Sequence, residues 1–103
     1  MDDQLQAALE RTIQGWQSMA EADPEQAEDA ADFFEQSFYQ FIDVFRSWVR
    51  KLTPQPRSVE ELLQLGTCQT IMQRLPEPLH LNFETEADLI IDNMERVEED
   101  KYD

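Results

Sequence analysis

A long apolar stripe between Pro24 and Leu52 constrains the fold more than any other feature of the sequence. Its members recur at alternating intervals of four and three positions, which is the repeat of one face of an α-helix. They are Ala27, Ala31, Phe34, Phe38, Phe41, Phe45, Trp48 and Leu52. A helix over residues 24–52 would be about 43 Å long at 1.5 Å per residue. Other apolar residues widen the stripe on both sides, so this helix needs more than one neighbour to cover it.

Two further stretches predict helices that supply this cover. Residues 3–22 carry apolar positions three and four apart, which is the pattern of an amphipathic helix. Ser58 is followed three positions later by Glu61, a capping box that opens a helix over residues 59–75. The apolar side of that helix changes direction near Gly66, so we expect a kink or a split at this glycine.

The stretch before the last predicted helix contains Pro76 and Pro78, which are expected to stop a helix. After them, Leu79, Leu81 and Phe83 alternate with polar residues. Alternation of this kind is typical of extended backbone. We therefore expect an extended connector that lays these apolar groups on the rest of the fold.

A last helix is expected over residues 85–99 with Thr85 as its cap, followed by a frayed acidic tail over residues 98–103. The chain has only 2 glycines and is rich in Gln, Glu, Ala and Leu, which favours helix over sheet. The sequence thus predicts one all-α domain spanning residues 1–103. Its expected architecture is a small antiparallel four-helix bundle with the long second helix at its centre.

The charge of the chain excludes several classes of function. There are 23 Asp and Glu against 8 Lys and Arg, which gives a formal net charge of −15. Direct nucleic-acid binding requires a basic surface, and an anionic membrane would repel this chain. The start of the chain lacks the basic and apolar regions of a signal peptide, and the single cysteine excludes an internal disulfide. We therefore expect a cytoplasmic protein.

Two rows of acidic residues lie opposite the apolar stripes of the second and last predicted helices. The first acidic row consists of Glu25, Glu28, Asp32 and Glu35. The second acidic row consists of Asp88, Asp92, Glu95 and Glu99. Like charges three and four positions apart repel each other by a few tenths of a kcal/mol per pair. A protein partner with a basic surface would relieve this repulsion, whereas a purely solvated face would only keep the chain in solution.

These rows favour a non-enzymatic interaction module of the inhibitor, immunity-type or chaperone-like kind, acting on a basic or aggregation-prone protein. A first alternative is a DNA mimic, whose carboxylates replace phosphates and compete with DNA for a nucleic-acid-binding protein. A second alternative is a small helical carboxylate metal protein or enzyme. No motif in the chain is specific enough to identify a family.

Residues that usually carry chemistry are few. His80 follows Glu77 by three positions, but prolines flank Glu77 and a di-iron bundle needs a second histidine. One histidine and one cysteine do not make a zinc site, and two distant glycines do not make a phosphate-binding loop. Cys68 is expected to be a buried, inert residue. We therefore expect no catalytic residue, no metal and no cofactor.

The flank of the apolar stripe is one further candidate surface. Phe33 and Val44 project about 140° and 120° from Phe38 at 100° per residue. Either another helix covers these two side chains or they belong to an interface. Because symmetric dimers are the commonest oligomers, we expect this flank to be the contact if the protein forms a homodimer.

Overall fold

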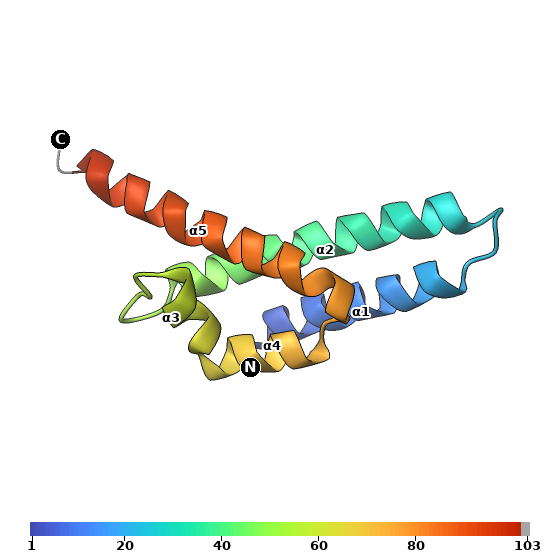
Figure 1. Ribbon diagram of the computed structural model, residues 1–103, viewed down its shortest axis with the longest axis horizontal. Coiled ribbons are helices and arrows are strands. Elements are labelled where there is room, and N and C mark those ends of the chain that lie inside the picture. The colour runs from blue at the N-terminus through green and yellow to red at the C-terminus, as the bar shows by residue number, and fades with distance from the viewer. Residues whose placement is uncertain (102–103) are drawn as a thin grey trace.

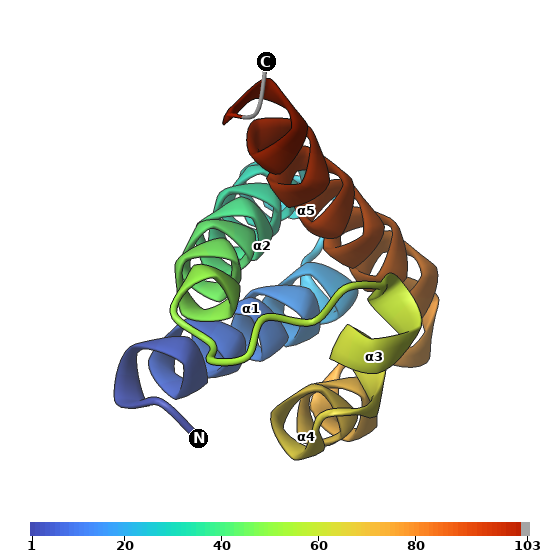
Figure 2. The same ribbon diagram turned by 90° about the vertical axis from the view of Figure 1, so that its left-hand side faces the viewer.

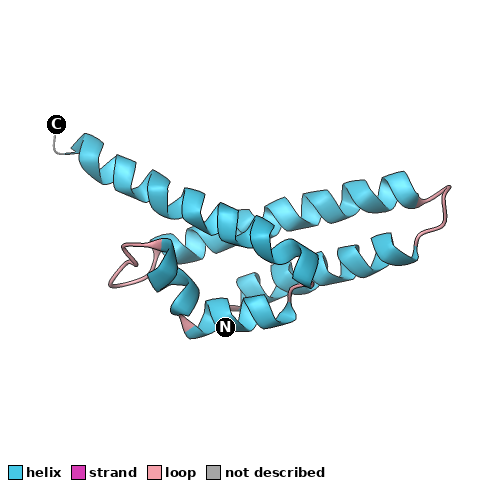
Figure 3. Ribbon diagram, viewed as in Figure 1, coloured by secondary structure: helices cyan, strands magenta, loops and turns pink. Residues whose placement is uncertain are grey.

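The structure is a computed structural model of the whole chain, and it describes the backbone of residues 1–101 and the side chains of residues 1–94. Within this range the fold is all-helical, which confirms the prediction of an all-α protein (Figure 3). The elements are α1 (Asp3–Glu21), α2 (Ala27–Arg50), α3 (Val59–Gln64), α4 (Gly66–Arg74), the 3-10 turn η1 (Glu77–Leu79) and α5 (His80–Lys101).

Helices α1 and α2 form an antiparallel hairpin that is the longest part of the molecule (Figure 1). Small residues of α1 let the two helices approach closely. A Cβ atom placed on Gly15 would lie 3.2 Å from the Cα of Phe34. One turn away, the hydroxyl of Thr12 donates a hydrogen bond of 3.1 Å to the carbonyl oxygen of Ser37. These contacts fix the separation and the register of the hairpin.

The core lies where the other helices join the hairpin. Helix α5 crosses α2, and both helices run toward the same end of the molecule (Figure 1). In the view along the long axis, α3 lies next to α5, and α4 lies below α3 at the edge of the molecule (Figure 2). Phe83 of α5 packs against two rings of α2, with its ring centroid 5.9 Å from that of Phe41 and 5.0 Å from that of Phe45. All three rings are fully buried.

The buried core occupies only one part of the hairpin. The last buried residue of α1 is Gly15 and the first of α2 is Ser37, so nothing between residues 16 and 36 is fully buried. This segment includes Phe34, whose position in the apolar stripe predicts a core residue. In the structure its side chain is half-buried and packs against Trp16. The end of the hairpin therefore extends beyond the helices that cover the rest of α2 (Figure 1).

The second predicted helix begins later in the structure than expected, and the third is divided beside Gly66, where a kink or a split was expected. Residues 24–26 form a turn rather than the start of α2, and Asp23 accepts a hydrogen bond of 3.1 Å from the backbone N–H of Gln26. The third predicted helix is divided, because Leu65 takes an extended conformation between α3 and α4. Gly66 is the first residue of α4.

The extended connector and the start of the last helix were predicted wrongly. Residues 77–79 form η1 and α5 begins at His80, so Thr85 lies inside a helix and caps nothing. Leu79 and Phe83 are buried whereas Leu81 is 71% exposed, because positions four apart share one face of a helix and positions two apart do not. The predicted frayed tail begins on a helical backbone that continues to Lys101, and the remainder lies outside the described residues.

Candidate functional site

The first acidic row lies on the outer face of the hairpin. All four of its side chains are exposed, with Glu25 in the turn before α2 and the other three on α2 itself. The sequence has no Lys, Arg or His between residues 12 and 45. Among the described residues, none of the four carboxylates forms an ion pair. The row is thus an uncompensated negative surface.

The second acidic row is only partly described. Asp88 and Asp92 are exposed on α5, and the side chains of Glu95 and Glu99 lie outside the described residues. Glu86 of α5 lines a hollow shared with α2. At 100° per residue, Asp88 lies about 160° around α5 from Glu86. Asp88 therefore points away from α2, whereas Asp92 lies in a hollow that also contains Arg46 of α2.

A shallow groove runs between α2 and α5, beside the first acidic row. Its first part is a hollow of about 440 Å³ at the point where α5 begins to cover the hairpin. The lining residues are Met19, Ala31, Phe34, Glu35, Phe38, Tyr39, Leu79, Asn82, Thr85 and Glu86. Tyr39 is 52% exposed and packs edge-on against Phe38, with ring centroids 5.6 Å apart.

Two further hollows adjoin this one and share residues with it. One, of about 280 Å³, continues along α5 from Glu86 past Leu89 to Asn93 and reaches Arg46 on α2. The other, of about 460 Å³, lies along α2 beside Glu35 and Tyr39. The first two hollows lie between the two helices, and we call them together the α2–α5 groove. The third is lined by α2 alone and borders this groove. The groove combines exposed apolar side chains with an acidic rim.

Arg46 is the one basic residue that lines the groove among the described residues, and it is neutralised. Its guanidinium lies 2.7 Å from the carboxylate of Asp43, one turn earlier on α2. Another acid of the rim, Asp92, lies near it in the same hollow. The groove therefore keeps its negative character along its length.

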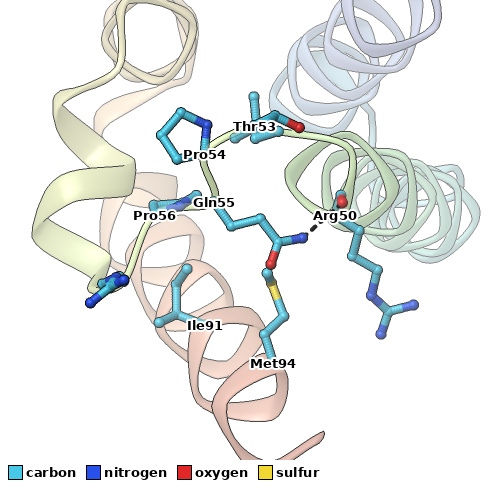
Figure 4. Close-up of a pocket in the computed structure, with 9 residues that line it drawn as sticks. Arg50, Thr53, Pro54, Gln55, Pro56, Ile91 and Met94 are labelled. Carbon is cyan, nitrogen blue, oxygen red and sulfur yellow. Dashed lines mark hydrogen bonds between the residues drawn. The ribbon is translucent and has the colours of Figure 1, made fainter. Parts of the chain in front are cut away.

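A second, chemically different hollow lies at the opposite end of α2. It measures about 650 Å³ and is formed by the loop after α2 together with Ile91 and Met94 of α5 (Figure 4). Gln55 spans this hollow and donates a hydrogen bond of 2.8 Å to the carbonyl oxygen of Arg50. Arg50 and Arg57 line it, and among the described residues neither forms an ion pair. The molecule thus carries a local cationic rim at the end of α2 distant from the first acidic row.

The predicted dimer flank faces α1. Val44 is half-buried and packs against the core. The ring of Phe33 lies 3.4 Å from the position that a Cβ of Gly15 would take, yet the side chain is 49% exposed. Helix α1 therefore covers this flank in part. A homodimer through Phe33 stays a prediction, and sedimentation equilibrium at high micromolar concentration tests it directly.

The residues with reactive side chains have structural environments. His80 donates from Nε2 to the carbonyl oxygen of Leu75 at 3.0 Å, which ties the start of α5 to the end of α4. Cys68 is buried in the core, and this burial raises the pKa of its thiol to about 12. The described residues contain no group of three or more His, Cys, Asp or Glu placed to hold a metal ion.

The groove was missed by the sequence analysis, although one of its residues gave a signal. Tyr39 directly follows Phe38 of the apolar stripe, yet it lies about 100° from Phe38 around the helix and between the acidic residues Glu35 and Asp43. That angle places it on the polar face. Leu89 and Glu86 gave no comparable signal, because their importance depends on where α5 crosses α2.

Searches against protein-family models, curated proteins and solved structures find no match to this chain. Within the described part of the chain, none of the helices combines the length and the apolar character needed to cross a bilayer. The exposed surfaces of the molecule are therefore the basis for inferring its function.

Proposed function

We propose that the protein is a non-enzymatic interaction module whose first acidic row binds a basic surface of a protein partner. The observation that carries this proposal is the exposure of the row on a part of α2 that other helices leave uncovered, with no cation paired to it among the described residues. Inhibition, immunity and chaperoning are the activities that such binding serves. In this role residues 1–103 act as one domain, an antiparallel four-helix bundle in which α3 and α4 together form the third member.

The electrostatics of the row support this proposal. Glu28, Asp32 and Glu35 lie three and four positions apart, so each carboxylate repels the next. Basic groups of a partner would relieve that repulsion, and the field of an acidic face accelerates encounter with a partner of opposite charge. Such binding weakens as salt rises, because the Debye length falls to about 8 Å at physiological ionic strength.

The experiment compares capture of proteins from the native host by three forms of the chain. The test variant combines Glu28→Gln, Asp32→Asn and Glu35→Gln. The matched control combines Asp3→Asn, Glu60→Gln and Glu77→Gln, which removes the same number of charges from exposed acids on other elements. Cross-linking at low and high salt, followed by quantitative mass spectrometry, reports what each form binds.

We expect a basic protein to be captured by the unchanged chain and by the control but not by the test variant, with capture declining as salt rises. Identical capture by all three forms would contradict the proposal. If the captured protein binds nucleic acid and duplex DNA displaces the chain from it, the module acts as a DNA mimic. The second acidic row is a further proposed contact, tested by Asp88→Asn in the same assay. We propose the cytoplasm as the site of action, since the one cysteine is a free, buried thiol.

A further inference from the structure

We propose that the α2–α5 groove is the docking site for a basic amphipathic helix of the partner, an inference that rests on the proposed function and specifies its partner. The groove differs from a simple acidic surface because large apolar side chains are exposed in it. Tyr39 is 52% and Leu89 55% exposed, and both line hollows of the groove. The half-buried ring of Phe34 also lines the groove, in the hollow that contains Tyr39 and Met19 of α1.

The geometry of the groove favours a helix over an extended segment. Both walls are α-helices, whose backbone groups are paired within each helix, so an extended chain would find no row of free backbone groups to bond with. The lining residues fall between positions 31 and 46 on α2 and between positions 82 and 93 on α5. The eleven steps along α5 correspond to about 16 Å, the length of three helical turns. A docked helix would therefore present apolar anchors at spacings of four and three.

The charge of the rim favours a basic occupant. Asp32, Glu35 and Asp43 border the groove on α2, and Glu86 borders it on α5. The basic residue in the lining, Arg46, is held by Asp43. Lys and Arg at the edges of an apolar helix face would meet these carboxylates. A second copy of this chain, with a net charge of −15, would bring acid to acid and is disfavoured as the occupant.

Two synthetic peptides of identical Leu and Lys composition and equal length test this inference. In the first, leucines recur at intervals of four and three, so the helix is amphipathic. In the second, the same residues are ordered so that leucines are spread around the helix. Fluorescence anisotropy at physiological salt gives both affinities, circular dichroism reports the helicity of the bound peptide, and amide chemical shifts locate the contact. The protein variants are Tyr39→Ser and Leu89→Ser. Leu81→Ser is the control, because Leu81 is an exposed leucine of α5 that does not line any of the hollows.

We expect the amphipathic peptide to bind at least tenfold more tightly than its isomer and to gain helicity on binding. Chemical-shift changes should concentrate in residues 31–46 and 82–93. Tyr39→Ser and Leu89→Ser should each weaken binding about tenfold, whereas Leu81→Ser should not. A circular dichroism spectrum and melting curve of each variant confirm that it folds.

Several results would overturn the inference without touching the proposed function. Equal affinity for both peptides, abolished by salt, would mean that charge alone attracts a partner. Binding with no gain in helicity would identify an extended occupant. Concentration-dependent broadening of groove amides without peptide would identify a second copy of the chain. Conversely, groove binding of the amphipathic peptide together with host capture that ignores the first acidic row would contradict the proposed function alone.

Discussion

The hydroxyl oxygen of Thr12 lies 3.1 Å from the carbonyl oxygen of Ser37, and this contact joins α1 to α2 in the interior of the hairpin. The same oxygen lies 3.0 Å from the carbonyl oxygen of Ala8, one turn earlier in α1. The single hydroxyl proton is therefore shared between two carbonyls. Thr12 is completely buried, so a nearly isosteric apolar replacement isolates the contribution of this polar contact.

Thr12→Val should lower the free energy of unfolding by about 1 kcal/mol, the usual net contribution of a hydrogen bond in a protein interior. Urea denaturation followed by circular dichroism measures this. Thr70→Val is the control, because its hydroxyl makes the same type of bond, 3.1 Å to the carbonyl of Gly66, on an exposed surface. Equal denaturation midpoints for the two variants would show that the contact between the helices contributes nothing.

The two glycines should respond oppositely to substitution by alanine. At Gly15 a Cβ would lie 3.2 Å from the Cα of Phe34, and this backbone atom cannot turn away as a side chain would. Overpacking commonly costs about 1–3 kcal/mol, which exceeds the roughly 1 kcal/mol that alanine gains in helix propensity. We expect Gly15→Ala to destabilise the protein by about 1 kcal/mol.

Gly66→Ala is the matched control for this pair of substitutions. A Cβ on Gly66 would meet no atom within 4 Å, and α4 begins there with ordinary helical geometry. We expect a gain of about 0.5 kcal/mol, because alanine restricts the unfolded chain more than glycine does. Thermal denaturation of both variants decides the question, and a stabilised Gly15→Ala would show that the helices separate at no cost.

Cys68 should make stability depend on alkaline pH. Burial raises the pKa of its thiol from 9.0 to about 12, so the folded protein keeps the proton where the unfolded chain loses it. Stability is therefore unaffected by this group below pH 9 and falls as the pH rises from 9 toward 12. At pH 10.5 the loss is about 2 kcal/mol.

The measurement compares urea denaturation of the unchanged chain and of Cys68→Ala at pH 7 and pH 10.5. The variant should lose less stability between the two pH values, because it lacks the thiol. In the native protein at pH 8, a thiol reagent should react with Cys68 only as fast as the core opens. Rapid labelling without denaturant would contradict the burial of this side chain.

The cap of α3 should stabilise the loop that forms the cationic hollow. Ser58 Oγ accepts a hydrogen bond of 3.1 Å from the backbone N–H of Glu61, whose carboxylate accepts one of 2.8 Å from the backbone N–H of Arg57. Ser58→Ala should destabilise the protein by about 1 kcal/mol. Ser47→Ala, at an exposed position inside α2, should leave stability unchanged or slightly raised. Equal effects of the two substitutions in urea would contradict the role of the cap.

The helices of this protein are predictable from sequence where the apolar period is long and uninterrupted, as it is in α2. The start of α5 was not predictable in this way, because Pro76 and Pro78 suggested a stop. Pro78 lies in the first turn of a helical segment, where the missing N–H would have no partner in any case. A pair of prolines can thus directly precede a helix. The apolar residues after such a pair should be compared with the helical period before an extended conformation is predicted.

The candidate site was only half predictable, for a different reason. Exposure of Glu28, Asp32 and Glu35 follows from their angle around a single helix, which the sequence contains. The α2–α5 groove depends on a crossing between segments that are at least 36 positions apart in the sequence, and no local pattern specifies where that crossing falls. Tyr39 and Leu89 therefore became candidates only when their exposure in the folded chain was known.

The absence of fully buried residues between positions 16 and 36 has a consequence for local unfolding. Segments with few buried contacts open at a smaller free-energy cost than the global transition, so their amides exchange with solvent first. The turn between α1 and α2 and the first turns of α2 should exchange well before the segment around Phe41. The first acidic row is thus carried by the part of the hairpin that opens most readily, and a partner bound there would slow the exchange of amides it never touches.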